Sequence, residues 1–387
     1  MSSVILKPGK EILFSRRHHW IFSGAIASFP EGVENGSLLP VYSHAGKKLG
    51  HAYFNQKSSL IGRIVSFGEK PPLEAISEQI ANAILLRKQL FQDQKTTAYR
   101  LINGEGDLLP GLIVDRYQDF LVMQIGTLGM EKLKGFICET LQNLLPIKGI
   151  YEKSLLSTRK EEMLAPHEEQ LWGEEWQEVT IQEEGLCFIV SRKGQKTGFF
   201  LDQREMRALI RSLAKGKRVL NCFAYTGGFT VAALAGGAIG ADSVDISESA
   251  LQIAQKNVAL NGFSDQNAFF CEDVLDFVKK RELDYDIVIL DPPAFAKKKG
   301  DIAAATRGYK AINTETMKKM PPESLLLTCS CSYHISEELF EKILVQSALM
   351  AKREVRIVGK HRLGMDHPIN LYHPETSYLK SFLLYLT

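Results

Sequence analysis

The sequence lacks an apolar segment long enough to span a bilayer, and it lacks paired cysteines and histidines with metal-site spacing. Its six cysteines are scattered apart from one C-x-C, Cys329 and Cys331, which argues against a zinc site. Residues 1–14 contain no uninterrupted apolar stretch resembling a signal peptide. We therefore expect a cytoplasmic protein with reduced thiols, no metal and no membrane partner.

An excess of either charge is also absent, because 47 Lys and Arg face 45 Asp and Glu, giving a net charge of +2. The first 70 residues differ, with nine Lys and Arg, four Asp and Glu, and four His. A basic end on a near-neutral chain indicates nucleic-acid binding, although a plain solvated surface explains the same charges about as well.

The 387 residues suit two or three domains. Composition divides them into three segments: 1–70, 71–192 and 193–387. The first has short β-type runs and predicts a small β-rich domain. The second mixes strands with helices near residues 73–92 and 130–144, which predicts an α+β domain.

The third segment alternates strands and helices regularly. Residues 218–222 predict a strand, and Ser247 is suited to cap a helix over residues 248–260. Further strands are expected at residues 242–246, 268–271, 285–290 and 324–328. This alternation predicts an α/β fold with a doubly wound, mostly parallel sheet, whose ligand lies beyond the carboxyl ends of the strands.

Residues suited to a nucleoside ligand follow successive predicted strands. Gly227 and Gly228 would let the backbone approach a ligand at a helix N-terminus. Asp245 is placed to accept hydrogen bonds from ribose hydroxyls, whereas Asp273 could equally cap the next helix. Asp291 opens an Asp-Pro-Pro-Ala-Phe turn that presents a carboxylate and carbonyls to a planar base.

One alternative is an NAD-dependent oxidoreductase. The phosphate-binding G-x-G-x-x-G is absent from the first loop, and this favours a cofactor without a pyrophosphate.

The C-x-C at the end of the last predicted core strand adds a possible nucleophile. Carbon 5 of cytosine is a poor nucleophile, but a thiolate that adds to carbon 6 makes carbon 5 able to accept a methyl group. Cysteine suits this role because a modest fall from its usual pKa of about 8.5 gives thiolate at neutral pH. Two buried structural thiols would explain the pattern equally well.

The whole chain resembles the bacterial 23S ribosomal RNA large-subunit methyltransferase I family, which makes 5-methylcytosine. The N-terminal HWIFSG at residues 19–24 looks like the RNA-binding PUA domain of that family, and residues 103–116 are similar to its middle domain. The segments 194–204, 221–229, 291–295 and 328–332 match its methyltransferase domain in order. The resemblance implies a Rossmann-like class I methyltransferase domain, S-adenosyl-L-methionine as cofactor and 23S ribosomal RNA as partner, with a homodimer left open.

The resemblance also implies residue roles. Cys331 would be the nucleophile, and Asp291 would contact the target base. The residues expected around the cofactor are Gln203, Phe223, Tyr225, Thr226, Gly227, Gly228, Asp245, Ile246, Asp273, Val274 and Asp291. The base that removes the carbon-5 proton stays open among Asp291, Asp366 and Glu375. A guanine-N methyltransferase of the same fold and an inactive RNA-binding factor remain alternatives.

Overall fold

The computed structural model describes residues 2–93, 95–296, 298–361 and 363–387. Its chain divides into two compact units. The first unit comprises Met1–Val179, Val190–Leu201 and Met365–Thr376, and the second comprises Thr180–Ile189, Asp202–Gly364 and Ser377–Thr387. No helix among the described residues is long and apolar enough to cross a membrane.

The first unit contains two sheets with separate apolar cores. A six-stranded sheet has the order β2-β6-β5-β4-β1-β3. Its strands are β1 (Val4–Leu6), β2 (Trp20–Ile21), β3 (Ile26–Ser28), β4 (Leu38–Tyr42), β5 (Lys48–Phe54) and β6 (Gly62–Phe67), and α1 (Ile12–Ser15) lies between β1 and β2 in the chain. The expected β-rich N-terminal domain is thus confirmed, and its apolar core is built from strand residues such as Ile21, Val41 and Ile64.

The other sheet of the first unit has the order β11-β10-β9-β8-β7. Its strands are β7 (Ala98–Asn103), β8 (Leu112–Tyr117), β9 (Phe120–Ile125), β10 (Gly149–Ser154) and β11 (His167–Gly173), and its helices are α2 (Pro72–Leu90), α3 (Leu128–Lys132) and α4 (Lys134–Leu144). The helix expected near residues 130–144 is therefore two helices, which meet at Leu133. This part of the chain is α+β, as predicted.

The second unit is built on a seven-stranded sheet with the order β16-β15-β14-β17-β18-β20-β19. The strands are β14 (Arg218–Cys222), β15 (Gly240–Asp245), β16 (Phe269–Cys271), β17 (Ile287–Leu290), β18 (Ser324–Ser330), β19 (Val355–His361) and β20 (Lys380–Leu386). Five strands run parallel, and β20 is inserted antiparallel between β18 and β19. The hairpin of β12 (Glu178–Glu183) and β13 (Leu186–Ser191) lies where the chain passes between units.

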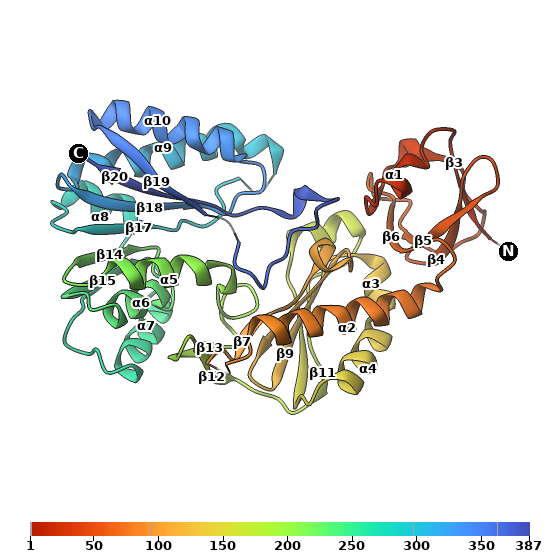
Figure 1. The fold of residues 1–387 in the computed structure, drawn as a ribbon, viewed down its shortest axis with the longest axis horizontal. Coiled ribbons are helices and arrows are strands. Elements are labelled where there is room, and N and C mark those ends of the chain that lie inside the picture. Colours follow the sequence, from red (N-terminus) through yellow and green to blue (C-terminus); the bar gives the residue numbers. More distant parts are fainter. Residues whose placement is uncertain (1, 94, 297, 362) are drawn as a thin grey trace. The chain divides into compact units, whose positions relative to one another are not determined.

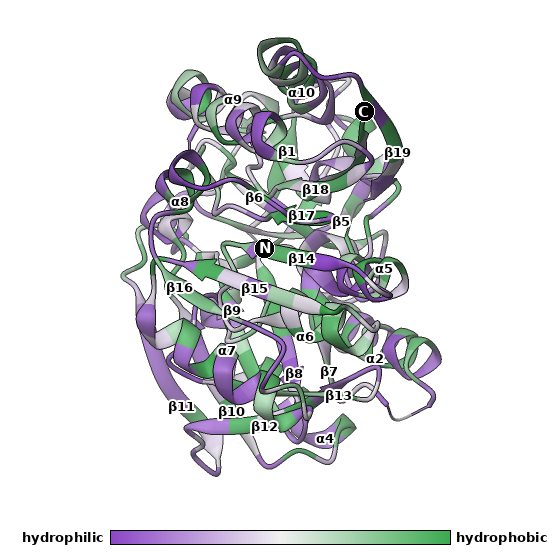
Figure 2. Ribbon diagram, turned by 90° about the vertical axis from the view of Figure 1, so that its left-hand side faces the viewer, coloured by the Kyte–Doolittle hydropathy of each residue, from purple (hydrophilic) through white to green (hydrophobic). Residues whose placement is uncertain are grey.

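Helices cover both faces of this sheet (Figure 1). They are α5 (Arg204–Leu213), α6 (Gly228–Ala235) and α7 (Glu248–Leu260) on one side, and α8 (Val274–Lys280), α9 (Ile302–Lys319) and α10 (Glu337–Ala351) on the other. Figure 2 shows β17 and β18 as mainly hydrophobic, while α9 alternates between hydrophilic and hydrophobic turns. Parallel strands such as β17 and β18, which are covered on both faces, are expected to be hydrophobic along their whole length. The doubly wound α/β fold is confirmed.

The order of the strands creates one switch point. The chain runs outward from β14 through β15 to β16 and then returns to β17 on the other side of β14. Register places Cys222 beside Val244 and Leu290, and Leu290 beside Thr328. The loops that follow these strands therefore meet at one edge of the sheet, where open α/β folds bind their ligands.

Candidate active site

The loop after β14 has a strained backbone. Phe223 and Tyr225 have positive φ values of 60° and 47°, and Gly227 follows with a φ of 78°. Residues other than glycine rarely adopt this region, and such residues cluster at ligand sites. A side chain at Gly227 would also collide with α7, because its Cβ would lie 2.9 Å from the Cβ of Ala254. The loop leads into Gly228, the first residue of α6, and the first backbone N–H groups of a helix are free to bind a ligand.

Asp245 ties this loop to the end of the neighbouring strand. Its Oδ2 accepts a hydrogen bond from the Tyr225 N–H at 2.9 Å, and its Oδ1 accepts one from the Ser247 N–H at 2.8 Å. Each carboxylate oxygen has further acceptor capacity. The carboxylate is thus held in a fixed orientation at the carboxyl end of β15, as a ribose-binding acid requires.

Several buried polar atoms at this edge have no hydrogen-bond partner among the described residues. They include Thr226 Oγ1, in the loop after β14, and Gln203 Oε1, just before α5. The amide nitrogen of Gln203 is satisfied, since it donates to Asp291 Oδ1 at 2.8 Å. Buried polar atoms are rarely left unpaired. Their presence fits a polar ligand such as S-adenosylmethionine, which carries an ammonium, a carboxylate and hydroxyls.

Three other residues predicted to surround the cofactor, Asp273, Ile246 and Val274, also follow strands and differ in exposure. Asp273 caps α8, because its Oδ1 accepts the Asp276 N–H at 3.0 Å. Asp273 therefore has the helix-capping role that the sequence offered as one of its two interpretations. A contact between Asp273 and adenine stays a prediction. Ile246 is strongly exposed and Val274 is buried. An exposed apolar side chain beside Asp245 is a suitable surface for a planar ring.

The thiols of the C-x-C have opposite environments. Cys329 lies inside β18 with none of its surface exposed, and burial raises its pKa well above the usual thiol value. Cys331 lies beyond the last residue of the strand and is half-buried, with Sγ 3.8 Å from the Pro292 carbonyl oxygen. Only Cys331 of the pair can reach a substrate. Its carbonyl contact places it against the Asp-Pro-Pro turn.

Ser332 fixes the turn that carries Cys331. Its Oγ accepts the Ala296 N–H at 3.2 Å and shares a 2.9 Å hydrogen bond with the Tyr309 hydroxyl. Its carbonyl accepts a 2.7 Å hydrogen bond from Lys380 Nζ. Ala296 directly follows the turn at residues 291–295, so Ser332 connects the two loops directly.

Two aromatic side chains border this turn. The Phe295 ring packs on Tyr309, with ring centroids 4.6 Å apart. The part of the ring that contacts Tyr309 is not accessible to a substrate base. Tyr333 is half exposed, two residues beyond the thiol. An exposed aromatic ring in this position suits stacking on a base.

The three candidates for the base are not equivalent. Asp291 belongs to this site through its bond with Gln203. Asp366 is fully buried in the first unit, where its carboxylate accepts the Arg100 N–H at 2.9 Å and lies 3.0 Å from His367 Nδ1. Glu375 lies beside His18 in the same unit. Of the three candidates for the proton acceptor, Asp291 is the one that lies at the carboxyl edge of the seven-stranded sheet.

His18, His373 and Glu375 form a cluster of possible metal ligands in the first unit. The ring nitrogens of the two histidines are 3.0 Å apart. The backbone N–H of Trp20 donates to His18 Nδ1 at 3.3 Å. A neutral His18 therefore carries its proton on Nε2, the atom that would have to bind the metal. The geometry therefore fits a hydrogen-bonded histidine pair better than a metal site.

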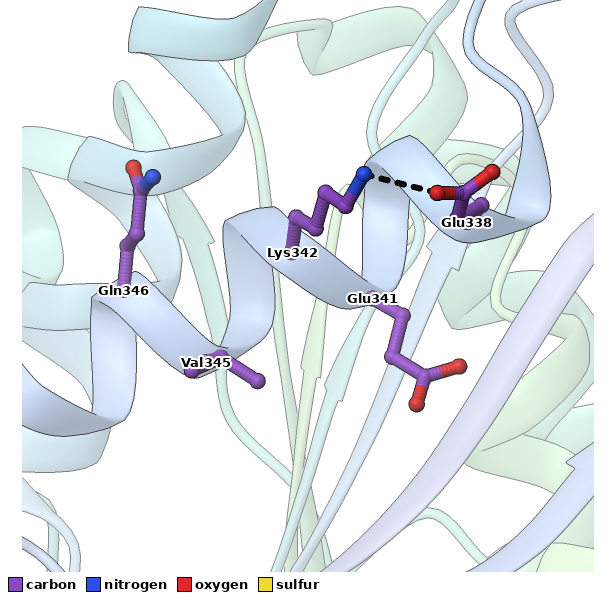
Figure 3. A pocket seen from close by; sticks show the side chains of 5 residues that line it. All are labelled: Glu338, Glu341, Lys342, Val345 and Gln346. Atoms are coloured by element: carbon purple, nitrogen blue, oxygen red, sulfur yellow. Dashed lines mark hydrogen bonds and ion pairs between the residues drawn. The ribbon is translucent and has the colours of Figure 1, made fainter.

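A surface hollow is lined by one face of α10 alone (Figure 3). Glu338 and Lys342 are ion-paired along that helix at 2.7 Å. The hollow contains no residue of the strand-end site, and its side chains make ordinary surface contacts.

Comparisons with known proteins show the family and the domains of the chain. A family model described as S-adenosylmethionine-dependent methyltransferase matches residues 157–352, and a PUA-like domain model matches residues 4–67. Curated relatives named ribosomal RNA large subunit methyltransferase I are 40% identical in Shewanella denitrificans, over 98% of both chains, and 39% identical in Aeromonas hydrophila, over 99% of both.

Solved structures share the same architecture. SMU.776, crystallised in complex with SAH, has a TM-score of 0.85 at 25% identity and is covered over its full length by 99% of this chain. The tRNA m1G37 methyltransferase of M. jannaschii, 18% identical, has a TM-score of 0.50 over 80% of this chain and 79% of its own, which shows a likeness of fold alone.

Proposed function

This chain belongs to the ribosomal RNA large subunit methyltransferase I family, and from that premise we propose that it forms 5-methylcytosine in 23S ribosomal RNA. It is an S-adenosylmethionine-dependent ribosomal RNA methyltransferase. The observation that supports cytosine C5 as the target is the half-buried Cys331 against the Asp-Pro-Pro turn. Transfer to a nitrogen or a hydroxyl needs no thiol.

The proposed chemistry assigns one step to each group. The Cys331 thiolate adds to carbon 6 of the cytosine, and the ring electrons move to make carbon 5 nucleophilic. Bound S-adenosylmethionine supplies an electrophilic methyl group for that carbon. Asp291 then accepts the carbon-5 proton, the double bond re-forms and the thiolate leaves. Asp291 is proposed as this base because it follows β17 and is oriented by Gln203.

The cofactor would be held at the switch point by the residues predicted from the sequence. Asp245 would accept the ribose hydroxyls, and Thr226 and Gln203 would pair their free oxygens with polar groups of the cofactor. The N-terminus of α6 would face its carboxylate. The adenine would lie between Ile246 and the loop after β16.

We propose that the RNA contacts a second part of the chain besides the catalytic domain. We propose that residues 1–70, which contain the PUA-like region, bind ribosomal RNA, and that residues 71–192 and 193–387 are the middle and catalytic domains. The target nucleotide must leave its stack, which costs a few kcal/mol. The sequence leaves a homodimer open, and analytical ultracentrifugation tests it.

The decisive experiment compares two thiol variants. Cys331→Ala should abolish tritium transfer from S-adenosylmethionine to ribosomal RNA of a strain lacking the enzyme, while cofactor binding measured by calorimetry stays unchanged. Cys329→Ala, the matched control within the same C-x-C, should retain turnover because that thiol is sealed inside β18. Turnover in Cys331→Ala would exclude the covalent mechanism and restore the guanine-N alternative.

Two further measurements address the product. RNA that contains 5-fluorocytosine at the target should form a stable adduct with the wild-type chain, because fluorine cannot leave as a proton does. Bisulfite mapping of ribosomal RNA with and without the enzyme would identify the nucleotide, and an unchanged map in 23S RNA would contradict the assignment.

A further inference from the structure

Lys380 is a buried lysine for which the described residues offer no carboxylate partner. It lies at the start of β20, opposite Ser330 of β18, and only 6% of its surface is exposed. Its Nζ donates to the carbonyl oxygens of Ser332 and Tyr378, each at 2.7 Å. Within the described chain no carboxylate lies in ion-pair distance of it. A charge this deep in a protein is normally paired with an anion.

Two ionisable groups act on this lysine electrostatically. They are Cys331 and Glu337, whose negative charges both favour the ammonium. Glu337 lies in the first turn of α10, and one of its oxygens is 3.8 Å from the exposed Lys360. Cys331 directly precedes Ser332, whose carbonyl the ammonium holds. The thiolate of Cys331 is therefore the anion that this position can accommodate.

We propose that Lys380 is the positioning residue of the nucleophile: its ammonium holds the Cys331–Ser332 turn and is the counter-ion of the Cys331 thiolate. This inference rests on the proposed function, in which Cys331 attacks the base. The thiol proton passes to water and the ammonium keeps its own protons, so no other reactant is needed. Two of its three N–H groups already point at carbonyls, which favours the charged form and disfavours a role as proton acceptor.

Burial of Lys380 sets an upper pH above which its ammonium loses its charge. Desolvation is the largest influence on Lys380 and lowers its pKa from 10.5 to about 8. The ammonium is therefore present at neutral pH and is lost as the pH rises through about 8.

The pKa of the thiol can be measured without RNA or cofactor. Iodoacetamide reacts with thiolates, and mass spectrometry of the Cys331 peptide gives the rate at each pH. In the wild type we expect an apparent pKa below the usual value of about 8.5. Lys380→Met should raise it by about one unit and so slow alkylation at pH 7 about tenfold. Lys380→Arg should restore most of the effect.

Lys360→Met is the matched control. It removes a lysine from the adjacent strand β19, where the side chain is exposed and pairs with Glu341 at 2.8 Å. Its alkylation profile should equal that of the wild type. A normal thiol pKa in the wild type would overturn the proposal, whether or not the Lys380 variants fold. An unchanged profile in folded Lys380→Met would do the same.

Cofactor binding and turnover separate the remaining outcomes. If Lys380→Met weakens binding of S-adenosylmethionine while the thiol pKa stays unchanged, the lysine serves the cofactor carboxylate and the proposal is wrong. We expect instead a lower kcat with little change in KM and a pH optimum shifted upward. If the alkylation results hold but Cys331→Ala still methylates RNA, the proposed function fails and the thiol–lysine pair remains.

Discussion

The hydrogen bonds of Asp245 predict how strongly this carboxylate contributes to cofactor binding. In Asp245→Asn one oxygen remains to accept a backbone N–H, and the new amide NH2 faces the other donor. The variant loses one charge-assisted bond within the chain, from either Tyr225 or Ser247, which costs about 1.5–3 kcal/mol of stability.

The same substitution removes the negative charge that would accept the ribose hydroxyls. Loss of one such charge-assisted bond, again about 1.5–3 kcal/mol, corresponds to a Kd for S-adenosylmethionine about 10- to 150-fold higher. Isothermal titration calorimetry measures this directly, and thermal unfolding monitors the structural part of the change.

Asp242 provides a control on the same strand. Its carboxylate accepts the Ala268 N–H and the Tyr285 hydroxyl, both at 2.8 Å, but it lies three residues before the carboxyl end of β15. Asp242→Asn should lose comparable stability and keep cofactor affinity. Equal Kd values for the wild type and Asp245→Asn, or equal weakening in the two variants, would refute the placement of the ribose at Asp245.

Three further predictions concern glycine, histidine and arginine positions. Gly227→Ala should destabilise the chain by about 1–3 kcal/mol and weaken cofactor binding, because its φ of 78° and the nearby Ala254 oppose a Cβ; calorimetry and melting test this. Burial lowers the pKa of His19 to about 4, so protonation of the unfolded chain removes up to about 3 kcal/mol of stability as pH falls from 6.5 to 4; His19→Gln should flatten this dependence in urea titrations. Arg87→Met should cost about 3–5 kcal/mol in the same assay, because Asp107 loses a buried bidentate partner bonded at 2.6 and 2.8 Å.

Sequence patterns located those elements whose signals are local. The strand at residues 218–222 and the helix at 248–260 have the predicted bounds, and Ser247 caps that helix by accepting the Ala250 N–H. Short polar caps and apolar periodicity are properties of neighbouring residues. The helix expected near 130–144 is divided at Leu133, and nothing in the apolar spacing signals that division.

The placement of the acidic residues at strand ends was also predictable, because parallel strands bring their carboxyl ends to one edge. Lys380 was not found, since it comes from an antiparallel strand whose position depends on distant pairing with β18 and β19. Its one available signal is a single cation at the start of a largely apolar C-terminal strand. Asp366 and Glu375 precede that strand closely in the chain, yet they belong to the first unit, a division that chain position does not reveal.

The choice between the two thiols depends on where one strand ends. Cys329 and Cys331 point in the same direction in an ideal strand, because side chains alternate with period two, so the C-x-C alone does not distinguish them. β18 ends at Ser330, and the backbone turns there under the control of Ser332, Tyr309 and Lys380. One thiol is sealed in the sheet while the next is held half-exposed at its edge on an anchored turn. If Cys331 is the nucleophile, as proposed, a thiol fixed in this way loses little freedom when the substrate arrives, and this is the condition under which positioning contributes most to rate.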